Sequence, residues 1–125
     1  MAITIVTAFF DIGRGSWCEE KGSPSYLERS NEKYFKYFSN LATLENNMIV
    51  FTSTEFISKI KSIRGNKPTI VIDVDLKQKF SKCLERISKI QGSREFRQKI
   101  NPDQLKNPEY WSAEYVLINN LKSYF

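Results

Sequence analysis

The sequence predicts an α/β fold: a three-layer, Rossmann-like half domain with a short parallel sheet and the element order β-α-β-α-β-α-α. Three short apolar runs rich in β-branched residues follow one another along the chain, as in strands that are buried on both faces. Segments with apolar residues at helical spacing separate these runs. Helical crossovers between buried strands require a parallel sheet with right-handed connections.

The first strand is expected at residues 3–10, where apolar and β-branched residues run almost without interruption. Residues 11–24 hold three glycines, a proline and several polar residues, which favours a long loop at the carboxyl end of this strand. A helix is expected next, because apolar residues recur every three or four positions: Tyr34, Phe35, Phe38, Leu41 and Leu44. Asn46 and Asn47 are expected to end it.

The second strand is expected at residues 48–52. Thr52 and Glu55 have the spacing of a capping box, which indicates that another helix opens there, and Gly65 suits its left-handed cap. The apolar face of this helix is formed by Phe56, Ile57, Ile60 and Ile63.

The third strand is expected at residues 69–75 and runs into Asp73 and Asp75. A helix ending at Gly92 follows, and its apolar positions are Phe80, Cys83, Leu84, Ile87 and Ile90. A short helical piece around Phe96 and Ile100 precedes a final helix that starts at Pro108 and has apolar residues at Trp111, Tyr115, Ile118, Leu121 and Phe125.

The length of 125 residues predicts a single α/β domain over residues 1–125. Three parallel strands make a narrow sheet with exposed edges, and the chain stops on an apolar segment. We therefore expect the domain to be incomplete at its carboxyl end or to pair with a partner. No apolar run is long enough to span a membrane and the start does not match a signal peptide, which predicts a cytoplasmic protein, with peripheral contact to the inner membrane as a further option.

The composition excludes several kinds of chemistry. There is no histidine, so a Ser-His-Asp triad and histidine-ligated metals are excluded, and any metal must be a hard cation held by carboxylates. The two cysteines, Cys18 and Cys83, match no zinc or redox spacing and are expected to be free thiols.

Ligands of open α/β sheets bind outside the carboxyl ends of the strands, which directs attention to the loop after the first strand. Glycines let the backbone approach a ligand, Arg14 between Gly13 and Gly15 could hold a diphosphate bidentately, and Asp11 could bind a ribose hydroxyl or a base edge. Trp17 or Phe10 could stack on a base or a sugar. The alternative is a tight turn with an ion pair between Asp11 and Arg14 and with Trp17 packed inside.

Asp73 and Asp75 form a second candidate, because two carboxylates one residue apart at a strand end can hold Mg²⁺ or Mn²⁺ against a diphosphate. A turn at Val74 would instead send the two carboxylates separately to solvent or to the next helix. Thr52 and Ser53, at the end of the second strand, are expected to act as helix caps.

The segment from Thr4 to Gly15, with its end Asp11-Ile12-Gly13-Arg14-Gly15, resembles the opening of the HtrL/YibB family, whose bacterial members are regarded as glycosyltransferases. The likeness continues through Arg29, the aromatic helix and residues 48–52, and returns weakly after Asn107. It covers the whole chain, its first half most strongly, and identifies the chain as the amino-terminal part of a family member.

The resemblance implies a GT-A-like fold and transfer of sugar from a nucleotide-sugar donor to a surface glycan such as lipopolysaccharide. It carries donor binding onto Asp11, Gly13, Arg14, Gly15 and Arg29. In such folds a metal-binding DxD ends a strand later than the third, so the resemblance does not strengthen Asp73 and Asp75 as ligands of Mn²⁺ or Mg²⁺. Catalytic residues and the acceptor site stay unassigned.

The charge distribution supports a different class of function. Residues 1–76 carry nine basic and nine acidic side chains, while residues 77–125 carry ten basic and five acidic ones, so the whole excess of +5 lies in the second half. The alternative is a non-catalytic binding or assembly module whose basic helices dock on an acidic partner or an anionic surface. Nucleic acid is not an expected partner, because the aromatic residues lie at helical core spacing and not on a strand platform.

Overall fold

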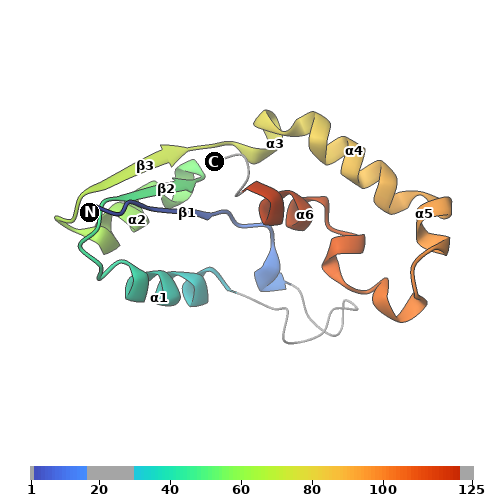
Figure 1. Ribbon diagram of the computed structural model, residues 1–125, viewed down its shortest axis with the longest axis horizontal. Coiled ribbons are helices and arrows are strands. Elements are labelled where there is room, and N and C mark those ends of the chain that lie inside the picture. Colours follow the sequence, from blue (N-terminus) through green and yellow to red (C-terminus); the bar gives the residue numbers. More distant parts are fainter. Residues whose placement is uncertain (1, 17–29, 122–125) are drawn as a thin grey trace. The chain divides into compact units, whose positions relative to one another are not determined.

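The three expected strands are present in the computed structural model, which describes residues 2–16 and 30–121. They are β1 (Ile5–Phe9), β2 (Met48–Thr52) and β3 (Thr69–Asp73), all parallel and in the order β1-β2-β3. In this register Phe9 lies beside Thr52, and Thr52 lies beside Asp73, so the three carboxyl ends are level (Figure 1). The predicted mixed α/β fold with a short, open parallel sheet is confirmed.

The chain divides into two compact units. The first contains residues 1–16 and 29–76, and thus holds the whole sheet. The second contains residues 17–28 and 77–125, and its described part is helical. One nucleotide-sugar-binding domain over residues 1–125 stays a prediction.

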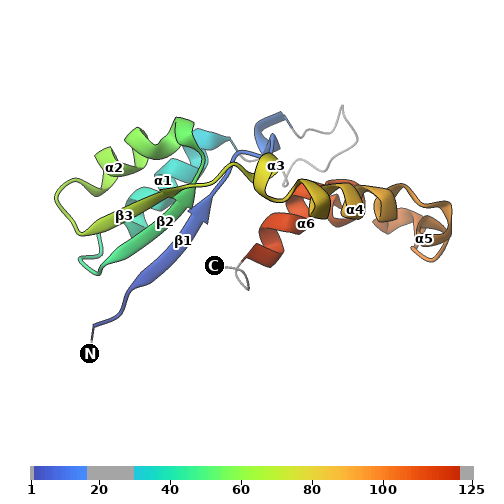
Figure 2. The same ribbon diagram turned by 90° about the horizontal axis from the view of Figure 1, so that it is seen from above.

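Helices α1 (Asn31–Leu41) and α2 (Ile57–Arg64) cover the same face of the sheet (Figure 2). Two right-handed crossovers that advance in one direction place their helices on one side, which explains this arrangement. The buried centre is Met48, Val50 and Ile60, and partly buried side chains surround it: Ile5, Phe35, Phe38, Leu41, Phe56 and Val71. The described residues of this unit thus form two layers, and the third layer stays a prediction.

The opposite face of the sheet is also apolar. The register places Val6, Ile49 and Ile70 in one row and Ala8, Phe51 and Ile72 in the next. Val6 is 52% exposed and Ile70 is 60% exposed. The strands therefore read as continuous apolar runs because both faces carry apolar side chains, although the described helices of this unit pack on one.

Among the described residues of the first unit, Arg64 carries the most deeply buried charged group, with 1% of the residue exposed. Its Nη1 donates to the carbonyl oxygens of Ala42 and Leu44 at 3.0 and 2.7 Å. Its Nη2 donates to the carbonyl oxygens of Asn46 and Pro68 at 2.9 and 3.0 Å. Its Nε donates to Thr69 Oγ1 at 2.7 Å, so all five N–H donors have acceptors.

Two expected features of the first unit differ in the structure. Thr52 does not cap a helix: it is 0% exposed, and its hydroxyl donates to the carbonyl oxygen of Phe9 at 2.8 Å. The next turn is a 3-10 helix, η4 (Thr54–Phe56), with Ser53 at its N-cap position and no side-chain cap bond. The expected capping box is therefore wrong, because Thr52 belongs to the sheet. Gly65, with φ of 61°, does end α2 in a conformation that favours glycine.

The described part of the second unit contains α3 (Leu76–Lys79, which begins at the boundary), α4 (Ser81–Gly92), α5 (Arg94–Gln98) and α6 (Ala113–Asn120). Helices α4 and α6 lie side by side (Figures 1 and 2). Gln91, at the end of α4, is buried and donates from Nε2 to the carbonyl oxygen of Glu109 at 3.1 Å. This bond ties α4 to the segment that precedes α6.

The final helix begins later than expected. Residues Pro102–Gln104 and Pro108–Tyr110 form separate 3-10 turns, η5 and η6. Ser112 then caps α6 by accepting a hydrogen bond from the backbone N–H of Tyr115 at 3.2 Å. Trp111 lies outside α6, is 41% exposed and donates from Nε1 to the carbonyl oxygen of Lys106. The spacing of the apolar residues did not reveal the serine cap that interrupts the pattern.

Within the described residues, no helix is both long and apolar enough to cross a membrane.

Replacing Arg64 by methionine is expected to lower the free energy of unfolding by at least about 3 kcal/mol, because several buried carbonyl oxygens would lose their donors. Arg64→Lys should recover only part of the loss, since a single ammonium cannot replace the planar fork. Urea unfolding followed by circular dichroism measures this. Lys61→Met, at an exposed position of the same helix, is the control, and equal midpoints for the two methionine variants would contradict the role assigned to Arg64.

Replacing Thr52 by valine is expected to cost roughly 1–2 kcal/mol of stability, because the shape is kept while the buried bond to the Phe9 carbonyl is lost. Thermal unfolding of this variant should be compared with that of Thr43→Val, whose hydroxyl is exposed. A midpoint for Thr52→Val at or above that of the control would show that the hydroxyl contributes nothing.

Candidate functional site

The loop after β1 is ordered by the carboxylate of Asp11. Its Oδ1 accepts a hydrogen bond from the backbone N–H of Gly13 at 2.8 Å, and Gly13 has φ of 84°, which favours glycine. Its Oδ2 accepts a hydrogen bond from Nδ2 of Asn31 at 3.1 Å, and Asn31 is the first residue of α1. Asp11 therefore holds the loop against the start of α1 while remaining exposed to solvent.

Arg14 begins the 3-10 turn η1 (Arg14–Ser16) and lies partly buried. Its Nη1 donates a hydrogen bond to the phenol oxygen of Tyr34 at 2.8 Å. Tyr34 lies in the first turn of α1, so this bond places a fixed positive charge near the amino end of that helix. A guanidinium and a helix amino end are both suited to phosphate oxygens.

The end of β3 brings a second carboxylate to the same edge of the sheet. Asp73 is the last residue of β3, and its Oδ2 accepts a hydrogen bond from the hydroxyl of Thr54 at 2.7 Å. The backbone N–H of Val74 donates to the carbonyl oxygen of Thr52, so pairing with β2 continues for one residue. Asp75 then stands directly before α3, and both carboxylates are exposed.

Asp11 follows β1 and Asp73 ends β3, so the width of the sheet separates these two acidic residues. β1 and β3 flank β2, which places their ends roughly 10 Å apart at the usual spacing of strands. This separation exceeds the size of a single phosphate and lies within the length of an extended nucleotide sugar. The loop after β1 and the end of β3 thus lie at the same edge of the sheet, about two strand spacings apart.

The donor atoms of Asp73 and Asp75 are chemically suited to a hard divalent cation. Among the described residues, however, no group of three or more histidine, cysteine, aspartate or glutamate side chains could hold a metal ion. Two carboxylates are a sufficient protein contribution only for a Mg²⁺-type ion that keeps water and takes further oxygens from phosphates. Binding of Mn²⁺ or Mg²⁺ by Asp73 and Asp75 therefore stays a prediction.

The structure brings most of the predicted donor-binding residues together. Asp11, Gly13, Arg14 and Gly15 share the loop after β1. Arg29 lies outside the described residues, as do Trp17 and Cys18. Phe10 is buried and is not available for stacking on a ligand. The alternative expectation for the loop is an ion pair between Asp11 and Arg14. In the structure the carboxylate of Asp11 instead accepts hydrogen bonds from Gly13 and Asn31.

The sequence does not predict the residues that form hydrogen bonds with the side chains of the site, which are Asn31, Tyr34 and Thr54. The spacing of Tyr34 from Phe38 and Leu41 predicts that Tyr34 lies on the apolar face of its helix. A topological signal existed: a crossover helix begins at the carboxyl end of the strand before it, so the first turn of α1 must face the loop after β1. A polar tip in that first turn is therefore a candidate site residue.

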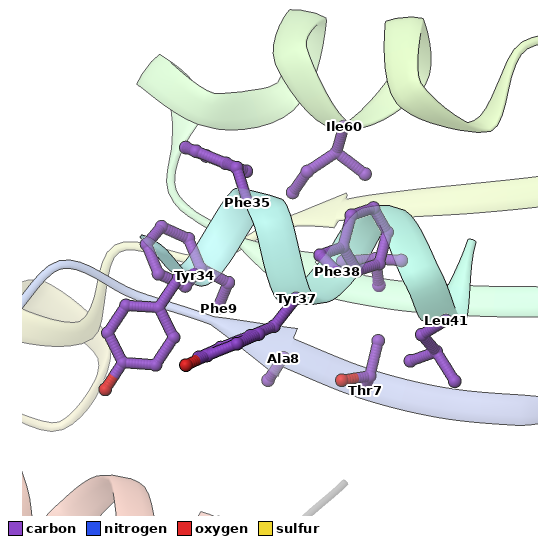
Figure 3. A pocket seen from close by; sticks show the side chains of 10 residues that line it. Thr7, Ala8, Phe9, Tyr34, Phe35, Tyr37, Phe38, Leu41 and Ile60 are labelled. Atoms are coloured by element: carbon purple, nitrogen blue, oxygen red, sulfur yellow. The ribbon is translucent and has the colours of Figure 1, made fainter. Parts of the chain in front are cut away.

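An apolar hollow of about 230 Å³ lies between α1 and β1, and we call it the aromatic hollow. Figure 3 shows its side chains, which include Thr7, Phe9, Tyr34, Tyr37, Phe38 and Leu41. The ring of Phe9 lies 5.3 Å from that of Tyr34 and 5.1 Å from that of Phe35. Tyr34 thus belongs both to the hollow and to the hydrogen bond with Arg14.

The comparisons with known proteins give one family. A family model described as "Bacterial protein of unknown function (HtrL_YibB)" matches residues 1–125. The chain is 54% identical over 122 residues to Protein HtrL of Escherichia coli (strain K12). This match covers 98% of the chain and 43% of that protein, so the chain spans less than half the length of this relative. No solved structure matches. The chain belongs to the HtrL_YibB family of bacterial proteins.

Proposed function

We propose that this chain is the donor-binding part of a nucleotide-sugar-dependent glycosyltransferase with a GT-A-like, three-layer fold. The observation that carries the proposal is the position of Arg14 and Asp11 at the carboxyl end of β1, beside the first turn of α1. Ligands of open α/β sheets bind at this edge, and the residues there have the charges that a nucleoside diphosphate requires.

Arg14 binds the diphosphate in this proposal, and the oxygens of Asp11 accept hydrogen bonds from the ribose. Each carboxylate oxygen can accept a second bond in addition to the one from Gly13 or Asn31. Gly13 and Gly15 let the backbone approach the phosphates, and Arg29 is a further candidate for them. The hydrogen bond to Tyr34 orients the guanidinium before the ligand arrives, which lowers the entropic cost of binding.

Sugar transfer breaks the bond between the anomeric carbon and the diphosphate oxygen, which keeps the electron pair. A hydroxyl oxygen of the acceptor forms the new bond and gives up its proton. Arg14 stabilises the negative charge that develops on the diphosphate, and such placed charges are a large source of rate enhancement. Mn²⁺ or Mg²⁺ at Asp73 and Asp75 would supply further neutralisation when bound.

The acceptor is proposed to be a surface glycan such as lipopolysaccharide, made at the cytoplasmic face of the inner membrane. Sugar transfer is proposed for the whole protein and not for this chain by itself, because the chain spans 43% of the length of Protein HtrL. This chain alone is expected to bind the donor without transferring sugar.

Isothermal titration of UDP-, GDP- and CMP-sugars in the presence of Mn²⁺ tests donor binding. One donor is expected to bind, and Arg14→Ala should weaken it at least about 10-fold, because a charge-assisted contact is lost. Arg86→Ala, which removes an exposed arginine of α4, is the matched control and should leave the Kd unchanged. No heat with any donor, or equal Kd values for the two variants, would contradict the proposal.

A second function is supported by the basic surface of the second unit. Lys82, Arg86 and Lys89 are exposed on α4 at spacings of four and three residues, which places them along one face of the helix. Lys89 lies 3.3 Å from Glu85, in an exposed pair that solvent and salt weaken. This face would dock a non-catalytic module on an acidic protein or an anionic membrane surface.

Docking of this kind predicts binding to vesicles that contain phosphatidylglycerol, with an affinity that falls steeply between 50 and about 500 mM salt. Lys82→Glu combined with Arg86→Glu, two substitutions on this face of α4, should abolish binding, while the donor titration stays unaffected. Co-sedimentation with charged and with neutral vesicles measures the binding of both chains to the anionic surface. Equal binding of the double variant and the native chain would exclude the basic face as the docking surface.

A further inference from the structure

We infer that the aromatic hollow between α1 and β1 binds the base of a nucleoside diphosphate. This inference rests on the proposed function and assigns a place to one part of the donor. The diphosphate lies against Arg14, and the base extends from there toward Phe9 and Tyr37. Neither Phe10 nor Trp17 is needed for stacking in this arrangement.

The hollow has the size and lining of a site for a flat ring. Its volume of about 230 Å³ is smaller than that of sites for drug-sized ligands, so it suits one ring system and not a whole nucleotide. Most of its lining is apolar, and five of its side chains carry aromatic rings: Phe9, Tyr34, Phe35, Tyr37 and Phe38. Aromatic side chains stack on every base, because every base has a π face.

One residue connects the aromatic hollow with Arg14 in the loop after β1. Tyr34 contributes its ring to the lining, and its phenol oxygen accepts the hydrogen bond from Nη1 of Arg14 at 2.8 Å. A positive charge therefore stands at the end of the hollow that is formed by Tyr34 and Phe9. A ligand with an aromatic ring at one end and a phosphate group at the other matches this combination of apolar lining and charge.

The hollow is open to solvent on the side of Tyr37. Figure 3 shows the side chains of Tyr34 and Tyr37 extending from α1 toward β1, and 54% of Tyr37 is exposed. Phe9 is held in place by contacts with three rings, the closest being Phe56 at 4.9 Å. Phe9 therefore forms an inner wall that is packed against other rings, while Tyr37 forms a wall that is exposed to solvent.

Isothermal titration with UDP, GDP and pyrophosphate, each with Mn²⁺, separates the base from the phosphates. A nucleoside diphosphate should bind more tightly than pyrophosphate to the native chain. Tyr37→Ala should weaken the nucleotide roughly 5- to 100-fold, because stacking is lost, and leave pyrophosphate unchanged. Arg14→Ala should weaken both ligands. Ile70→Ala, which removes exposed apolar surface on the other face of the sheet, should weaken neither.

Tyr37→Trp keeps a stacking surface and adds a fluorescent probe to the hollow. It should bind the nucleotide as well as the native chain does, and the base should quench the indole fluorescence. This variant tests binding of the base in the hollow if Tyr37→Ala does not fold. Equal affinities for nucleotide and pyrophosphate, or absence of quenching, would overturn the base site while leaving the phosphate site standing. Absence of binding by every ligand would overturn the proposed function together with this inference.

Discussion

The buried guanidinium of Arg64 is the interaction on which the geometry of the first unit depends. Its acceptors lie in two separate segments, the connection that leads from α1 into β2 and the start of β3. Four backbone dipoles and one hydroxyl replace the water that this charge loses on burial. Because these segments lead into β2 and β3, the bonds fix where each strand begins. A slip of one residue in either strand would turn its apolar side chains to the other face.

The position of the strand starts determines the candidate site at the opposite edge of the sheet. Fixed starts and a fixed register place Phe9, Thr52 and Asp73 level with one another. The hydroxyl of Thr52 reinforces this alignment by donating to the carbonyl oxygen of Phe9. The carboxyl end of β1 therefore has a fixed position, and the loop that contains Asp11 starts there, beside the first turn of α1. The rigid core thus supplies the precision that a binding loop lacks by itself.

The sequence predicted the order and direction of the elements well, because apolar periodicity and short connections determine both. It did not predict Arg64, since a basic residue in the last turn of a helix ordinarily interacts with solvent and the helix dipole. Burial of that side chain depends on two loops that are distant in sequence. Likewise, Thr52 and Glu55 match the local pattern of a capping box. In the structure the hydroxyl of Thr52 instead donates a hydrogen bond to the carbonyl oxygen of Phe9 in the neighbouring strand. Local patterns failed at the positions where tertiary hydrogen bonds compete with them.

For the candidate site, the sequence identified the loop but not its neighbours, and the topology explains both results. In open α/β sheets ligands bind outside the carboxyl ends of the strands, and Asp11 and Arg14 follow the carboxyl end of β1. β1 is an edge strand of the observed sheet. Helix α1 packs on this edge strand, and the aromatic hollow lies between the two. A tyrosine in the first turn of α1 consequently reaches the loop with its oxygen and the hollow with its ring.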